Sequence, residues 1–203
     1  MKTTAKEPKQ KRAVKKREDL INAALELFLE RGFYDTNSKE IAKKAKVSIG
    51  LFYNYFNDKS DIFLEILKRI QYNNYIELKV ALNAVAKEEN KKEILRRYII
   101  QGVKSLSEMF YLYQDIEVIK KHYPKIGDAF SKSKELSKNL LINFLENVNK
   151  HESLKISHIK SSIITTTITA NCFEIAKIDN EEKQKEVIEI LLNLIYDFLL
   201  GYI

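Results

Sequence analysis

The chain has 203 residues, of which 45% are hydrophobic and 31% are charged, a balance typical of a folded globular protein and not of a disordered one. It contains five glycines and two prolines, too few for the many turns of a β-sandwich or barrel, so a mostly helical fold is predicted. The single cysteine, Cys172, excludes an internal disulfide framework and a multi-cysteine zinc site.

The chain begins with a basic arm, residues 1–16. Up to Arg17 it carries eight lysines or arginines against Glu7 alone, which accounts for the whole net charge of +7. Such an arm most often contacts phosphates or an acidic membrane surface, and a solvated tail is the less favoured alternative. It lacks the apolar segment of a secretory signal, so a cytoplasmic location is expected.

The first helix is predicted from residue 17, where apolar side chains begin to repeat at helical spacing, and it stops at Gly32. Asn37 and Glu40 then have the spacing of a capping box. They predict a short second helix that ends near Ala45.

A third helix follows, in which Ser48 is the predicted N-cap and the helix extends from Ile49 to Tyr55 or Phe56. Two short helices joined by a turn match a helix-turn-helix, whose second helix enters the major groove of DNA. Residues 17–60 are therefore predicted to be a DNA-binding domain.

This recognition helix has an inner and an outer face. Phe52 and Phe56, four residues apart, are predicted to face the core. On the other side, Asn54 can hydrogen-bond adenine and Leu51 can contact a thymine methyl group. The remaining outward groups are suited to phosphate contact or close backbone approach, although the tyrosines are also compatible with ordinary surface aromatics: Ser48, Gly50, Tyr53 and Tyr55.

Residues 61–203 are predicted to form a larger helical domain. A long helix capped by Asp58 or Ser60 enters it and extends to about residue 86. Further helices are expected over about 91–107, 110–121, 124–150 and 154–177, and a last one follows the capping pair Asp179 and Glu182. Residues 161–169 favour a strand by propensity, but an isolated strand would have no partner, so a helix is predicted there.

The last helix has apolar residues on more than one side, which indicates either burial against a two-fold mate or a fully buried core helix. Polar residues interrupt it, so no membrane span is predicted. Aromatic residues of the second domain, together with Met109, are candidates to line an apolar pocket: Tyr72, Tyr75, Tyr98, Phe110, Tyr111, Tyr113, Tyr123, Phe130, Phe144 and Phe173.

Residues 17–67 resemble the tetracycline-repressor (TetR) family of bacterial transcription regulators. The resemblance is carried by an ordered series of motifs: Ile21-Asn22-Ala23-Ala24-Leu25-Glu26-Leu27-Phe28, Arg31-Gly32-Phe33, Glu40-Ile41-Ala42, Val47 to Phe56, and Lys59. It implies an all-α chain with a three-helix DNA-binding domain and a helical bundle that binds a small ligand and dimerises through its last two helices. The implied function is a repressor released from a pseudo-palindromic operator by a small molecule, without a cofactor or catalytic activity.

The resemblance also implies DNA-contacting positions. Thr36, Ser38 and Lys39 correspond to residues that touch phosphate or groove. Positions that mostly hold phosphates are those of Ser48, Gly50, Tyr53, Tyr55 and Lys59, and positions that can face bases are those of Ile49, Leu51 and Asn54.

Four residues depart from the family pattern. Lys46 replaces a common turn glycine and is expected at a positive φ, and Ser38 replaces an aliphatic residue. Ile49 replaces a frequent lysine and lies near the Phe52 stripe, so it is a core candidate as well. Tyr55 replaces a common histidine. These departures bear on the operator sequence rather than on the fold.

Two other functions are compatible with the composition. The balanced charge of residues 18–203 also suits a helical small-molecule carrier or adaptor with a degenerate helix-turn-helix. The basic arm also suits a protein that binds a membrane surface. The three histidines show no metal-ligand spacing, and no nucleophile motif or phosphate loop is present, so neither a metal site nor catalysis is expected.

Overall fold

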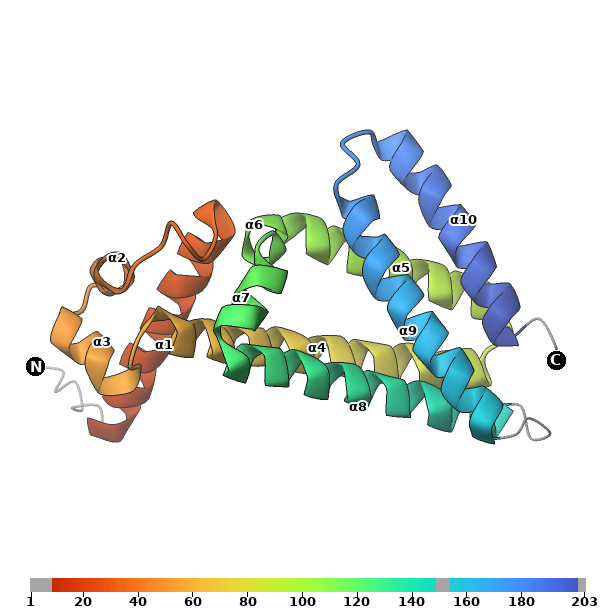
Figure 1. The fold of residues 1–203 in the computed structure, drawn as a ribbon, viewed down its shortest axis with the longest axis horizontal. Coiled ribbons are helices and arrows are strands. Elements are labelled where there is room, and N and C mark those ends of the chain that lie inside the picture. The colour runs from red at the N-terminus through yellow and green to blue at the C-terminus, as the bar shows by residue number, and fades with distance from the viewer. Residues whose placement is uncertain (1–8, 149–153, 201–203) are drawn as a thin grey trace, which may run out of the picture. The chain divides into compact units, whose positions relative to one another are not determined.

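The computed structural model describes residues 9–148 and 154–200, and every regular element among them is an α-helix (Figure 1). This confirms the predicted all-helical fold. In chain order the helices are α1 (Lys9–Arg31), α2 (Ser38–Lys44), α3 (Ile49–Tyr55), α4 (Lys59–Lys87), α5 (Lys91–Glu108), α6 (Phe110–Tyr113), α7 (Ile116–His122), α8 (Pro124–Val148), α9 (Leu154–Ala176) and α10 (Glu181–Leu200).

The described residues divide into two compact units. The first contains residues 9–69 together with residues 111–126, and the second contains the rest. Helix α4 contributes its first part to one unit and its second part to the other. The DNA-binding motif therefore lies in a unit that also includes a segment from the middle of the chain.

An aromatic cluster forms the core of the first unit. The ring of Phe63 lies edge-on to Phe28 and Phe33, with centroids 5.1 and 4.9 Å away. Tyr123 adds a fourth ring, 5.4 Å from Phe33. Edge-to-face pairs at these distances stabilise a core beyond simple burial. Tyr123 thus joins residues 111–126 to the core around which α1 and α4 pack.

Gly32 ends α1, as predicted, and its N–H donates to the carbonyl of Phe28 at 3.0 Å. Its φ of +82° is a left-handed conformation that favours glycine. A β-carbon there would lie 3.0 Å from Nε2 of Gln114 and 3.1 Å from the carbonyl oxygen of Tyr111. A glycine is therefore required both by the turn and by the close approach of the 111–126 segment.

The start of α1 differs from the expectation. The helix begins at Lys9 and not at Arg17, so residues 9–16 of the predicted arm are helical. Lysine and arginine have good helix propensity, which explains why the helix continues into the basic segment. Residues 1–8, the rest of the arm, lie outside the described residues.

Two other boundaries also differ. The helix expected over residues 110–121 is divided into α6 and α7. The N-terminus of α10 is capped by Asn180, whose Oδ1 accepts from the N–H of Lys183 at 2.9 Å, in place of the predicted pair Asp179 and Glu182. Asparagine and aspartate cap equally well, so two adjacent candidates cannot be separated by residue type.

The predicted helix over α9 is confirmed despite its β-branched residues. The hydroxyls of Thr165 and Thr169 donate to carbonyls four residues earlier, each at 2.7 Å, and Ser161 donates to the carbonyl of His158 at 2.9 Å. These bonds satisfy the hydroxyl groups within the helix itself. The segment therefore remains helical without polar partners elsewhere.

The second unit is built from the later part of α4 together with α5, α8, α9 and α10. Helices α5, α9 and α10 all contact one another (Figure 1). Its core is aliphatic, with Ile99, Leu145 and Leu192 almost fully buried. Arg96 links α5 to α10 by donating to both carboxylate oxygens of Glu189, at 2.6 and 2.9 Å.

Candidate nucleic-acid interface

Helix α2 is fixed at its N-terminus by the predicted capping box. Oδ1 of Asn37 accepts from the N–H of Glu40 at 3.1 Å, and the Glu40 carboxylate accepts from the N–H of Asn37 at 3.3 Å. Burial of Ile41 and Ala42 anchors the opposite face of the helix. The first turn of α2 therefore has a defined position, with Lys39 exposed on it.

The turn after α2 is closed by a pair of backbone hydrogen bonds. The N–H of Val47 donates to the carbonyl of Ala42, and that of Lys46 donates to the carbonyl of Lys43, at 3.0 and 3.1 Å. This is a Schellman motif, in which the residue at the position of Lys46 adopts the left-handed conformation. The φ of Lys46 is 54°, so the expected positive φ of a non-glycine residue is confirmed.

Helix α3 begins at the predicted cap, where Oγ of Ser48 accepts from the N–H of Leu51 at 3.1 Å. Phe52 and Phe56 are 0% and 5% exposed, which fixes the inner face of the helix. Successive side chains are rotated by about 100° around the helix axis, so the residues on the side opposite to Phe52 and Phe56 project outward.

The outward face of α3 is open to solvent. Tyr53 is 55% exposed and Ile49 is 38% exposed. Gly50 and Asn54 are exposed as well, while Leu51 is half-buried. Of the two roles considered for Ile49, the structure therefore supports the surface and not the core. These residues form one continuous surface with the capped start of the helix.

Thr36 does not belong to that surface. Its side chain is only 1% exposed, and its hydroxyl donates to the carbonyl of Gly32 at 2.9 Å. A buried hydroxyl that already donates its proton has no free donor for a phosphate. In the structure Thr36 therefore stabilises the link between α1 and α2, and its expected DNA contact stays a prediction.

Lys59 is also occupied inside the unit. Its ammonium group donates to the carbonyls of Phe33, Tyr34 and Thr36 at 2.7, 3.2 and 2.8 Å, which uses all three N–H donors. It lies 4.4 Å from the centroid of the Phe33 ring, and burial lowers its pKa. Lys59 therefore connects the α1–α2 link to the start of α4, and its expected phosphate contact stays a prediction.

Tyr55, at the end of α3, is half-buried. Its hydroxyl donates to the carbonyl of Ala13 in α1 at 3.1 Å. This contact was not predicted from the sequence, and the signal for it was the presence of tyrosine at a position where histidine is common. Ser38, the remaining predicted residue, is half-buried in the first turn of α2.

Free positive charge surrounds the turn between the two short helices. Lys39, Lys43 and Lys46 are exposed. Lys44 instead pairs with Glu26 and Glu30 of α1, with nitrogen–oxygen distances of 3.0 and 2.9 Å. The exposed cations suit an anionic partner such as a phosphate backbone.

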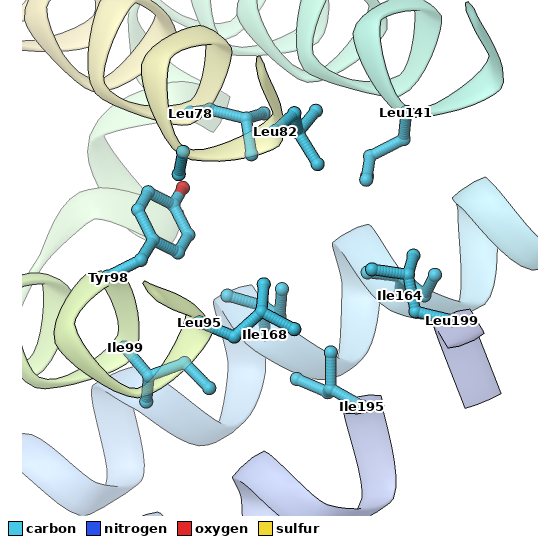
Figure 2. Close-up of a pocket in the computed structure, with 11 residues that line it drawn as sticks. Leu78, Leu82, Leu95, Tyr98, Ile99, Leu141, Ile164, Ile168, Ile195 and Leu199 are labelled. Atoms are coloured by element: carbon cyan, nitrogen blue, oxygen red, sulfur yellow. The ribbon is translucent and has the colours of Figure 1, made fainter. Parts of the chain in front are cut away.

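The second unit contains a small apolar cavity of about 20 Å³ (Figure 2). Among the aromatic candidates for a pocket, Tyr98 lines it, and its ring extends from α5 toward α4. Burial raises the pKa of Tyr98 to about 12. The other lining residues are aliphatic: Leu78, Ala81, Leu82, Leu95, Ile99, Leu141, Ile164, Ile168, Ile195 and Leu199.

Within residues 9–148 and 154–200, the His, Cys, Asp and Glu side chains form no group of three that could hold a metal ion. None of the helices in these ranges combines the length and apolarity needed to cross a bilayer.

The sequence model described as "Bacterial regulatory proteins, tetR family" matches residues 20–66, the segment that contains α2, the turn and α3. The DNA-binding segment of this chain belongs to the TetR family. The chain is 49% identical over 55 residues to the HTH-type transcriptional regulator HbdR of Aromatoleum sp. (strain CIB), and the match covers 27% of this chain and 24% of that protein. It is 30% identical over 113 residues to the HTH-type transcriptional regulator QacR of Staphylococcus aureus (strain Mu50), and the match covers 56% of this chain and 50% of that protein.

The matched part of the chain spans half or less of the length of these two relatives. A solved structure extends the likeness of fold to most of the chain. A TetR-family transcriptional regulator from Mesorhizobium loti MAFF303099 has a TM-score of 0.73 with 16% identity, covering 91% of this chain and 96% of that one. The second unit therefore has the fold of a TetR-family protein.

Proposed function

We propose that this chain is a transcriptional repressor that binds a two-fold symmetric operator as a homodimer and is released by a small apolar molecule. The observation that carries the proposal is the outward face of α3, which is capped, anchored by Phe52 and Phe56, and open to solvent. The fold and the relatives give no support to the carrier or adaptor alternative.

The residues of this face are assigned two tasks. Asn54 reads a base through its amide, and Leu51 and Ile49 contact apolar base edges such as the thymine methyl group. The others hold the phosphate backbone and so set the register of α3 in the groove without reading sequence: Ser38, Lys39, Ser48, Gly50 and Tyr53. Lys43 and Lys46 add positive charge near the same backbone.

Exposed apolar residues on the last two helices support dimerisation there. On α9, Ile156, Ile159 and Ile163 recur at helical spacing and are 46–51% exposed. On α10, Ile190 and Leu194 are 62% and 58% exposed. A two-fold axis would pair these stripes with their own copies and bury them, and would present two recognition helices to successive major grooves, about 34 Å apart.

The cavity in the second unit supports the choice of effector. Its wall is aliphatic apart from Tyr98, so a charged molecule would lose its hydration there without gaining a partner. A volume of about 20 Å³ holds little more than one water molecule. A ligand must therefore separate the surrounding helices, and a ligand that prefers the separated state shifts the chain toward it.

The test compares Asn54→Ala with Tyr53→Ala on a fragment from immediately upstream of the chain's own coding sequence and on a scrambled duplex of equal length. Asn54→Ala is expected to lose roughly 1–3 kcal/mol on the cognate fragment alone, because only a base contact depends on sequence. Tyr53→Ala is expected to lower the affinity for both duplexes by the same factor. Equal losses on the two duplexes for Asn54→Ala would refute its base-reading role.

A further inference from the structure

The first turns of α1 are held against the end of α3 by two contacts. The hydroxyl of Tyr55 donates to the carbonyl of Ala13 at 3.1 Å. Four residues later, the guanidinium of Arg17 lies 5.2 Å from the centroid of the Phe56 ring, and it pairs with Glu65 at 3.4 Å. Both Tyr55 and Phe56 belong to the end of the recognition helix, so the position of this basic segment is linked to that of α3.

Residues 11–16 of this segment carry four cations, and all four are exposed: Lys11, Arg12, Lys15 and Lys16. Because they lie on a helix, they divide into two pairs by direction. Lys11 and Lys15 are each two residues from Ala13, which places them on the side of α1 roughly opposite to it. Arg12 and Lys16 lie about 100° around the helix from that pair, on a flank next to Ala13.

The flank that carries Arg12 and Lys16 is also the flank on which α2 packs. Arg12 and Glu30 are 18 residues apart, which is about five complete helical turns, so they project in the same direction. Glu30 pairs with Lys44 of α2 at 2.9 Å. The Arg12 and Lys16 pair is therefore directed to the side of α1 on which the helix-turn-helix lies.

We infer that Tyr55 is a positioning residue for DNA binding, whose hydroxyl holds the start of α1 so that Arg12 and Lys16 contact the phosphate backbone beside the half-site read by α3. This inference rests on the proposed function. The partner is DNA and not another anionic surface, because these two cations are directed to the side of α1 on which α2 of the helix-turn-helix packs.

This role differs from the phosphate contact expected of Tyr55. A phenol has one proton to donate, and here the carbonyl of Ala13 accepts it. A phosphate oxygen accepts hydrogen bonds but offers none. Tyr55 therefore acts through the two cations that it positions, and not through a contact of its own.

The test measures the salt dependence of binding for the full chain, using the upstream fragment and the scrambled duplex. Each phosphate neutralised contributes about 0.9 to the slope of log K against log salt. Arg12→Gln with Lys16→Gln should lower the magnitude of the slope by about 1.8 on both duplexes. The matched pair Lys11→Gln with Lys15→Gln removes the same charge and should lower it distinctly less.

Tyr55→Phe removes only the hydroxyl, and loss of one hydrogen bond corresponds to roughly a fivefold loss in affinity. That loss is expected in the otherwise native chain and absent when Arg12 and Lys16 are already glutamines. An equal loss in both backgrounds would mean that Tyr55 acts only on domain stability, and would overturn the inference. An unchanged slope for the Arg12 and Lys16 variant would overturn it as well.

The outcome also separates this inference from the proposed function. If the native chain binds the upstream fragment and Tyr55→Phe has no effect, only the inference fails. If the native chain binds neither duplex but co-floats with vesicles of phosphatidylcholine and phosphatidylserine, both fail, and the basic segment is a membrane-binding surface.

Discussion

At the scale of single residues, the interior of the first unit decides which polar groups are available to DNA. The ammonium of Lys59 would be a phosphate ligand if it were free, but three backbone carbonyls accept its protons. The hydroxyl of Thr36 is likewise used within the unit. Both groups satisfy carbonyls of the α1–α2 link, or of the helix before it, that would otherwise lose hydrogen bonds on burial.

Replacement of Lys59 by methionine retains the aliphatic stem but removes the three donors. The chain is expected to lose roughly 1–3 kcal/mol of unfolding free energy, because partly buried carbonyls lose their partners. Urea denaturation followed by circular dichroism measures the change. Lys43→Met, at an exposed lysine, is the control and should stay within about 0.5 kcal/mol. Similar values for the two variants would contradict the structural role of Lys59.

The Arg69–Glu18 pair predicts a pH dependence. Arg69 donates to both oxygens of Glu18 at 2.6 and 2.8 Å, and these hydrogen bonds lower the pKa of Glu18 from its ordinary value of 4.5. Stability from such a lowered pKa is present above pH 4.5 and is lost as the pH falls through the lowered value. Both side chains are about 40% exposed, so the contribution is below about 1 kcal/mol. Glu18→Gln should be less stable than the native chain at pH 7, and the difference should vanish in acid; a constant difference would contradict this.

At the scale of elements, caps and stops were the features that the sequence predicted best. Asn37, Ser48 and Gly32 each act within four residues of their own position, so local residue type was sufficient. The start of α1 at Lys9 was not predicted, because residues 9–16 lack the apolar repeat on which the prediction of this helix rested. No residue there blocks a helix, so the helix continues into the basic segment. The interior roles of Lys59 and Tyr55 were missed because their partners lie 23 or more residues away in the chain.

The turn between α2 and α3 offers a stabilising substitution. Lys46 has a φ of 54°, which costs a residue with a β-carbon roughly 1–2 kcal/mol. Lys46→Gly should therefore raise the unfolding free energy by up to about 1 kcal/mol, since the greater freedom of glycine in the unfolded chain offsets part of the gain. Lys46→Ala retains the β-carbon and is the matched control. A gain for alanine equal to that for glycine would show that charge, not conformation, is responsible.

At the scale of the whole molecule, the path of the chain links the two units covalently at three places. It passes between them within α4, near residue 110 and near residue 126. The segment 111–126 thus belongs to the DNA-binding unit although α5 and α8 on either side belong largely to the other. The proposed effector, which would separate the helices of the second unit, would therefore act on three connections and not on α4 alone.

The proposed dimerisation through α9 and α10 gives the final prediction. Ile190→Lys with Leu194→Lys places two charges on side chains that are 62% and 58% exposed in one chain, so the fold should tolerate them. Buried against a two-fold mate, the same charges would be unpaired and the dimer should dissociate. Sedimentation velocity measures the mass, and circular dichroism verifies the fold.

Loss of the dimer should also weaken operator binding roughly a hundredfold or more, because one half-site no longer raises the effective concentration of the second recognition helix. Ile100→Lys, on α5 and 43% exposed, is the control and should leave both mass and affinity unchanged. If the α10 variant remained a dimer with native affinity, the two recognition helices would have to be joined through another surface, and the exposed residues of α9 and α10 would require a different partner.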